Sequence, residues 1–154
     1  MRSLRSSGPT APQIGSRDGL KKERFADYFA RLFAYACGAT GDDEAARDVA
    51  VAAFTEVFAM PDLRESEFEL VLFGGARRLC ASGEYRLRRH NDGLSPRERD
   101  VLSLVFDGKL AGPQIGRLLG IRPETVSATL TRGLRKLQQR LGQASAVPGQ
   151  PHFA

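Results

Sequence analysis

A run of polar and basic side chains between residues 122 and 136 has the composition and spacing of a surface that binds nucleic acid. If a helix begins near Pro123, the side chains on its exposed side are those of Glu124, Thr125, Ser127, Ala128, Thr131, Arg132 and Arg135. The members nearest the helix start, with Arg122 just before it, are placed to reach base edges in a DNA groove. Arg132, Arg135 and Lys136 lie further along and suit phosphate groups, which add affinity without reading the base sequence.

A helix-turn-helix is the element that would present such a helix to DNA, and residues 112–137 have its spacing. The first helix needs a small residue where the second packs against it, and Gly116 fills that position. Gly120 follows in the turn, where a residue tolerant of positive φ is required. Val126 comes later as the apolar anchor of the second helix. The alternative interpretation of this spacing is a helical hairpin that is basic but binds no DNA.

The preceding segment predicts a further helix that supports the motif. Ser95 is a good N-cap, Pro96 fits the first helical position, and Glu98 stands at the capping-box position. Apolar residues follow at helical spacing, and Asp107 with Gly108 ends the helix.

Three more helices are predicted in the front part of the chain. Apolar residues at spacings of three and four predict a helix over 21–37, and two acidic caps predict a second over about 42–60. A third starts near Arg64, where Gly74–Gly75 either interrupts the helix or allows another element to pack closely. No strand-like alternation of useful length occurs, so we expect an all-α fold.

We therefore expect two small helical domains, the second a helix-turn-helix, joined by a short linker. The first twenty residues are rich in Ser, Gly, Pro and Arg, which is typical of a disordered segment. Asn-Asp-Gly in the linker is turn chemistry. The predicted order is a disordered tail (1–20), a first helical domain (21–90), the linker (91–94), the helix-turn-helix domain (95–141) and a second disordered tail (142–154).

The charge of the chain is divided between its two halves. The formal net charge is +5, but residues 25–72 hold ten acidic and three basic side chains. Residues 73–90 hold five basic and one acidic side chain, and residues 94–142 hold nine basic and four acidic ones. An acidic front half joined to a basic back half indicates a different partner for each.

Several classes of protein are disfavoured by the composition. No apolar run is long enough to span a membrane, and the first 24 residues lack the apolar segment of a secretory signal, so we expect a cytoplasmic protein. Cys37 and Cys80 are far apart in sequence, and His90 and His152 are isolated, so no cluster of metal ligands is visible. No phosphate-binding glycine motif or nucleophile–base signature occurs. We therefore expect no enzymatic activity, cofactor, metal or small-molecule substrate.

The back of the chain resembles the C-terminal DNA-binding domain of bacterial sigma factors. The resemblance covers residues 94–141 and is carried by LSPRERDVL at the start, IGRLLGI around the turn and TVSATLTRGLRKL in the last helix. LuxR-type response regulators share much of this pattern. The front segment FADYFARLFAYACGATGDDEAARDVAVAAFTEVF (25–58) looks like the polymerase-binding helices of extracytoplasmic-function (ECF) sigma factors. The segment FELVLFGGARRLCASGEYRLRRH (68–90) lies where that family has its promoter-melting helix and the basic run after it.

This resemblance implies a partner for each charged region. Core RNA polymerase would bind the acidic side chains of the front helices, namely Asp42, Asp43, Glu44, Asp48 and Glu56. The melted promoter would contact a basic stretch that consists of Arg77, Arg78, Tyr85, Arg86, Arg88 and Arg89. The helix-turn-helix would bind upstream promoter DNA. An anti-sigma factor is a further partner that the resemblance suggests, and its existence stays open.

Two other functions stay open at this point. A LuxR-like or sigma-derived regulator would bind DNA without replacing a sigma factor, and the short linker and the absence of Trp support it. A protein-interaction module that titrates an anti-sigma factor would show no specific affinity for DNA. Association with core RNA polymerase is the property that the sigma-factor interpretation predicts.

Overall fold

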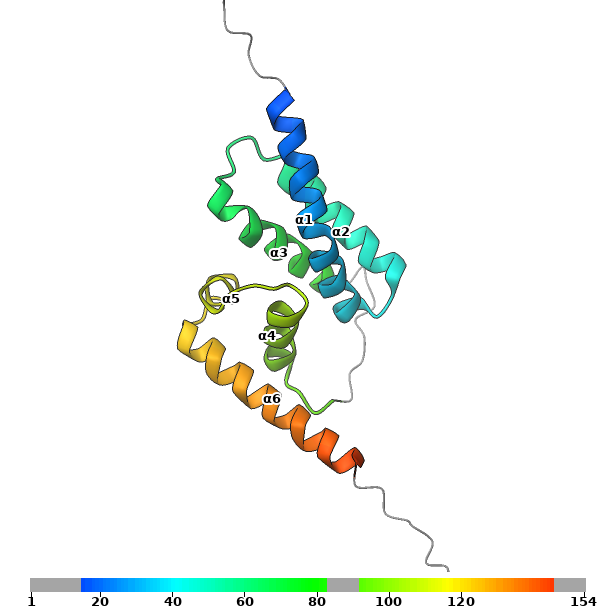
Figure 1. Cartoon of the computed structure of the whole chain (residues 1–154), viewed down its shortest axis with the longest axis vertical. Helices are drawn as coiled ribbons and strands as arrows, with labels where there is room; N and C mark the ends of the chain where they lie inside the picture. Colours follow the sequence, from blue (N-terminus) through cyan, green and yellow to red (C-terminus); the bar gives the residue numbers. More distant parts are fainter. Residues whose placement is uncertain (1–14, 83–91, 146–154) are drawn as a thin grey trace, which may run out of the picture.

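The fold is all-α, as the sequence predicts. A computed structural model describes residues 15–82 and 92–145, and that part of the chain contains six α-helices and no strand. The helices are α1 (Gly15–Thr40), α2 (Asp43–Phe58), α3 (Glu65–Ala81), α4 (Pro96–Phe106), α5 (Gly112–Leu119) and α6 (Pro123–Ser145). Helices α1, α2 and α3 form one group, while α4 and α5 lie between that group and the long helix α6 (Figure 1).

Aromatic side chains fill much of the space between the three front helices. The ring centroid of Phe25 on α1 lies 4.9 Å from that of Phe29 and 4.8 Å from that of Phe54 on α2. Phe58 on α2 continues the cluster to Phe68 on α3, at 6.1 Å between centroids. Such pairs add to the free energy gained by burial of apolar surface, so they fix how the front helices pack.

Two helices extend beyond the boundaries that the sequence predicts. Helix α1 begins at Gly15, inside the expected tail 1–20, and α6 continues to Ser145, inside the expected tail 142–154. Once a helix is nucleated, each further residue adds one backbone hydrogen bond without a new nucleation cost. The expected tail boundaries at residues 20 and 142 are therefore wrong by a few residues, while residues 1–14 and 146–154 lie outside the described part of the chain.

Helix α3 continues through Gly74–Gly75 without a break. A Cβ atom at Gly74 would lie 3.3 Å from Leu118 Cδ1 of α5, and one at Gly75 would lie 3.5 Å from Glu56 Oε2 and 4.0 Å from Ala53 Cβ of α2. The glycines therefore allow other helices to pack closely and do not interrupt α3. The glycines lower helix propensity, but they let α5 approach α3 at Gly74 and α2 approach it at Gly75.

The apolar core runs without interruption from the front helices into the helix-turn-helix. One cluster of buried residues includes Leu72 and Phe73 of α3 together with Leu104 of α4 and Ile115 of α5. A Cβ atom at Gly108 would lie 3.0 Å from the Phe73 ring, so the loop after α4 touches α3 directly. The two groups of helices therefore share a buried contact, and the division of the chain into two domains stays a prediction.

Hydrogen bonds border this apolar junction. The Tyr35 hydroxyl of α1 donates to Asp100 Oδ1 of α4 at 3.1 Å, and Arg77 Nε of α3 donates to Asp100 Oδ2 at 2.8 Å. Arg31 Nε of α1 donates to the carbonyl oxygen of Gly108 at 2.8 Å. These bonds join side chains of the front helices to α4 and to the loop that follows it.

Candidate nucleic-acid interface

The turn of the predicted helix-turn-helix has the expected geometry. Gly120 ends α5 in the left-handed conformation, with φ 67° and ψ 34°. A Cβ atom at Gly116 would lie only 2.7 Å from the carbonyl oxygen of Ile121, so the chain after the turn packs against α5 at this point. Val126 is 2% exposed and joins the core below the turn. The predictions for the small residue, the turn glycine and the apolar anchor are all confirmed.

Helix α4 supports α6 and begins with the predicted capping box. The Ser95 hydroxyl accepts a hydrogen bond from the Glu98 backbone N–H at 3.2 Å, while Glu98 Oε2 accepts from the Ser95 backbone N–H at 2.8 Å. Pro96 occupies the first turn, as the sequence predicts. Both members of the box are therefore satisfied locally, and the helix start is well defined.

The outer face of α6 is open to solvent. The exposed residues include Arg122 before the helix and all seven that the sequence assigns to this side: Glu124, Thr125, Ser127, Ala128, Thr131, Arg132 and Arg135. Within residues 15–82 and 92–145, neither Arg132 nor Arg135 forms an ion pair. The Thr131 hydroxyl donates to the Ser127 carbonyl oxygen within the helix at 2.9 Å. The face thus offers the cations of Arg122, Arg132 and Arg135 and several small polar groups to a polyanion, and their roles as DNA contacts stay predictions.

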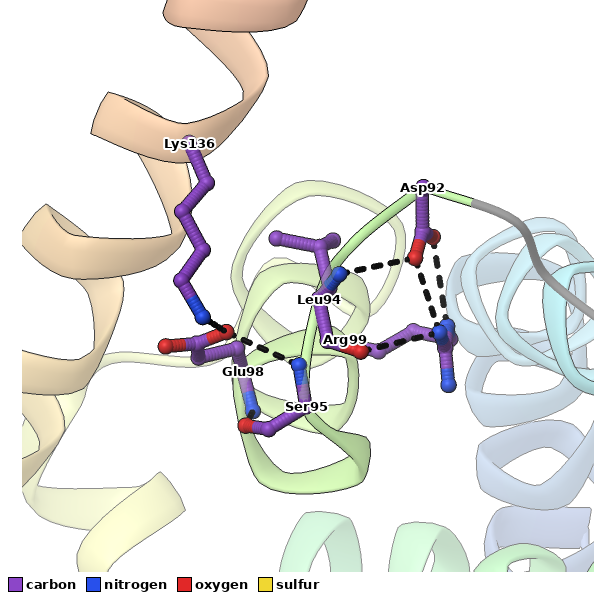
Figure 2. A network of polar contacts seen from close by, with 6 residues as sticks. All are labelled: Asp92, Leu94, Ser95, Glu98, Arg99 and Lys136. Carbon is purple, nitrogen blue, oxygen red and sulfur yellow. Dashed lines mark hydrogen bonds and ion pairs between the residues drawn. The ribbon is translucent and has the colours of Figure 1, made fainter.

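Lys136 differs from the other side chains predicted to bind phosphate. Its ammonium group lies 2.9 Å from Glu98 Oε2, and the Glu98 side chain is only 2% exposed (Figure 2). The side chain of Lys136 therefore reaches toward α4 in this structure, away from the open face of α6. The sequence pattern does not reveal this because the two partners are 38 residues apart.

The basic stretch after Gly75 is only partly within the described residues. Arg77 pairs with Asp100 of α4, and Arg78 pairs with Glu56 of α2. Tyr85, Arg86, Arg88 and Arg89 lie outside the described part of the chain. Arg77 and Arg78 are thus brought to acidic residues of neighbouring helices, and a contact of these two arginines with melted promoter DNA stays a prediction.

The acidic residues predicted to bind polymerase have different local partners. Asp42 is the N-cap of α2, and its carboxylate accepts a hydrogen bond from the Glu44 N–H at 3.2 Å. Asp43 lies in the first turn, where its charge suits the positive end of the helix dipole. Asp48 is exposed on the next turns of α2, whereas Glu56 pairs with Arg78. The first four residues thus cluster at one end of α2, and Glu56 lies apart near the other end.

Asp100 and Arg31 are two residues whose importance sequence reasoning missed. Asp100 accepts hydrogen bonds from Tyr35 and Arg77, while Arg31 pairs with Glu69 and lies over the Tyr28 ring at 4.7 Å from its centroid. The pKa of the Tyr35 hydroxyl is raised, mainly because the side chain is buried and secondly because Asp100 is negatively charged. Tyr35 therefore stays protonated and remains a hydrogen-bond donor. No signal in the sequence identifies the hydrogen bonds of Asp100 or the ion pair of Arg31 with Glu69, because they join segments that are distant along the chain.

The geometry of α4, α5 and α6 agrees with one comparison to known families. Residues 92–139 match the family model of sigma-70, region 4. The match spans α4, α5 and most of α6 and includes none of the front helices. The back of the chain is thus a sigma-factor-like, DNA-binding helix-turn-helix region. No curated protein matches the chain.

Neither a cluster of metal ligands nor a membrane-spanning helix occurs among the described residues. No group of three or more His, Cys, Asp or Glu side chains in residues 15–82 and 92–145 is arranged to hold a metal ion. None of the helices in that part of the protein is both long enough and apolar enough to cross a membrane.

Proposed function

We propose that the protein is a transcription initiation factor of the sigma-70 type, which binds core RNA polymerase and directs it to promoter DNA. The observation that carries the proposal is the open face of α6, mounted on a helix-turn-helix whose sequence matches sigma-70 region 4. The N-terminal part of that face, from Arg122 to Ala128, contacts base edges, and Arg132 and Arg135 contact phosphates. The resemblance of the front helices to those of ECF sigma factors supports that subtype.

The acidic end of α2 is the surface that we assign to polymerase. Asp42, Asp43, Glu44 and Asp48 are all exposed there. Charges of one sign on a docking surface accelerate encounter with a partner of the opposite sign. Glu56 is assigned to the internal contact with Arg78 instead, since its carboxylate is paired there.

Co-elution with purified core RNA polymerase in size-exclusion chromatography tests the proposal. The unmodified protein should co-elute, and Asp48→Lys should weaken the association. Asp62→Lys is the matched control because it makes the same charge change at an exposed aspartate beyond the other end of α2. Run-off transcription from a promoter library then tests initiation. Separate elution of well-folded protein would overturn the sigma-factor proposal.

The direct packing of the two helix groups favours a second candidate, a stand-alone DNA-binding regulator. Two promoter elements on successive helical turns lie at least ~34 Å apart. In the structure α4 and α5 pack on α1 and α3 through Phe73, Gly108 and Asp100. A factor that contacts two such promoter elements would therefore have to move its two groups of helices apart. A regulator that reads only one element needs no such separation. It would bind DNA with sequence preference and elute apart from polymerase.

A further inference from the structure

Glu98 is the one charged residue among the buried residues of the described chain, and a single oxygen of its carboxylate joins two helices. Its Oε2 atom accepts from the Ser95 backbone N–H at 2.8 Å and from Lys136 Nζ at 2.9 Å. Figure 2 shows the Lys136 side chain extending from α6 to this carboxylate at the start of α4. The same group that caps α4 thus also binds a residue on the helix that carries the open face.

The ion pair lies beside a tight contact between the two helices. A Cβ atom at Gly133 would lie 3.0 Å from Leu102 Cδ1 and 3.6 Å from Glu98 Cβ, so α6 crosses α4 at Gly133. Helical side chains lean toward the N-terminus, so the stem of Lys136 covers the turn that contains Gly133. The crossing therefore has a point of close contact at Gly133 and a directional polar bond next to it.

The segment before α4 has hydrogen bonds of its own beside the capping box that includes Glu98. Asp92 Oδ1 accepts from the Leu94 N–H at 3.0 Å and from Arg99 at 2.8 Å. Arg99 also donates to the Leu94 carbonyl oxygen at 3.3 Å. These bonds and the capping box surround the beginning of α4 (Figure 2). Lys136 is thus bonded to a helix start that several further hydrogen bonds hold in place.

We infer that Lys136 is a positioning residue of the DNA-reading surface: with Glu98 it sets the tilt of α6 on α4. This inference rests on the proposed binding of DNA by α6. Thr125 lies eight residues from Gly133, or roughly 12 Å along the helix. A tilt of about 10° around Gly133 would therefore move it by roughly 2 Å, enough to break a hydrogen bond to a base. Lys136 acts on base recognition through Glu98 and makes no phosphate contact.

Four substitutions separate positioning from phosphate binding and from stability. Lys136→Met removes the charge and retains a long side chain that favours helix. Glu98→Gln removes the charge but retains an oxygen that can accept from Ser95. The double variant removes the ion pair without leaving a buried charge unpaired. Lys136→Arg is the conservative variant, and Arg132→Ala, an exposed arginine of the same helix, is the comparison for a phosphate contact.

The assay is fluorescence anisotropy over a range of salt concentrations with two labelled duplexes. One duplex is selected from a random library by the unmodified protein, and the other has mixed sequence. Circular dichroism and urea denaturation establish that each variant is folded at the assay temperature. The ratio of the two affinities measures base recognition, and the salt dependence counts phosphate contacts.

Lys136→Met should lower the preference for the selected duplex by about tenfold, the loss expected from one misplaced base contact, and leave the salt dependence unchanged. The double variant should regain the stability that Lys136→Met loses but should not regain the sequence preference. Lys136→Arg should retain the sequence preference. Arg132→Ala should weaken binding to both duplexes to the same extent and reduce the salt slope by about 0.9.

Two results for Lys136→Met would overturn the inference: an unchanged preference for the selected duplex, or a salt slope reduced as in Arg132→Ala. Absence of any sequence preference in the unmodified protein would instead overturn the DNA-reading role of α6.

Discussion

At the scale of single residues, the two bonds to Glu98 make its ionised form the stable one. The hydrogen bond from Lys136 is the largest cause that lowers the pKa of this carboxyl group below its ordinary value of 4.5, and the backbone N–H of Ser95 is the next. A carboxyl group whose pKa is lower in the folded than in the unfolded protein stabilises the fold only while it is ionised. Its contribution is complete above pH 4.5 and is lost as the pH falls through the lowered value.

Replacement of Glu98 by Gln should remove this pH-dependent part of the stability. The free energy of unfolding of the unmodified protein should fall below pH 4.5, and that of the variant should fall less, so that the two curves converge in acid. Urea denaturation at a series of pH values measures this. Glu23→Gln, at an exposed glutamate within α1, is the control for the same change from carboxylate to amide. A constant difference between Glu98→Gln and the parent at all pH values would contradict the prediction.

Arg132 and Arg135 on α6 have the opposite property, since neither forms an ion pair within residues 15–82 and 92–145 and both charges stay available to DNA. Arg132→Ala should weaken DNA binding and lower the dependence of log K on log salt by about 0.9, because one fewer counterion is released. Arg47→Ala, which removes an exposed arginine of α2 outside the helix-turn-helix, is the control and should leave the slope unchanged. Titrations with a mixed-sequence duplex at several salt concentrations test both variants. An unchanged slope for Arg132→Ala would exclude a phosphate contact at this position.

At the scale of secondary-structure elements, the helix-turn-helix depends on contact between backbones. The Gly116 Cα faces the Ile121 carbonyl oxygen so closely that there is no space for a methyl group. Backbone after the turn cannot move aside as the end of a flexible side chain can. The angle between α5 and α6 is therefore set where the chain leaves the turn.

Gly116→Ala should destabilise the protein by about 1–3 kcal/mol, the usual cost of forcing an extra carbon into a packed site. Gly112→Ala is the matched control because a Cβ atom there would meet nothing within 4 Å. The control should be neutral or slightly stabilising, since alanine restricts the unfolded chain more than glycine does. Urea denaturation gives both values. Equal stabilities for the two variants would show that the contact at Ile121 relaxes without cost.

At the scale of the whole molecule, the front helices and the helix-turn-helix meet around Phe73 and Asp100. Phe73 is fully buried, and Asp100 accepts from one residue of α1 and one of α3. A packed apolar contact bordered by charged hydrogen bonds transmits a change in one helix group to the other. A substitution in one group of helices should therefore change the stability and the amide hydrogen exchange of the other group as well.

Tyr35→Phe should lower the free energy of unfolding by about 1 kcal/mol through loss of the hydrogen bond to Asp100. It should also speed amide exchange in α4, although the substitution is in α1. Tyr28→Phe is the control, since it makes the same change where the hydroxyl forms no hydrogen bond within the described residues. Hydrogen exchange followed by mass spectrometry compares the two. A response confined to α1 would show that the two helix groups are energetically independent.

Residue types that are close together along the chain are enough to predict the all-α class, the capping box of Ser95 and Glu98, and the turn at Gly120. Each of these depends on hydrogen bonds or backbone conformation within about four residues, so local residue types specify them. Helix ends are specified less sharply, and α1 and α6 therefore extend past the predicted boundaries.

The packing of the helices, by contrast, sets which charged residues are paired internally and which remain open to solvent. Lys136 and Arg132 are both cations on α6, yet Lys136 binds a carboxylate 38 residues away and Arg132 has no such partner in the described chain. Tyr35 and Asp100 are 65 residues apart and meet only because α1 packs against α4. Contacts of this kind depend on how helices cross, and the crossings follow from the packing of the whole core rather than from any short segment.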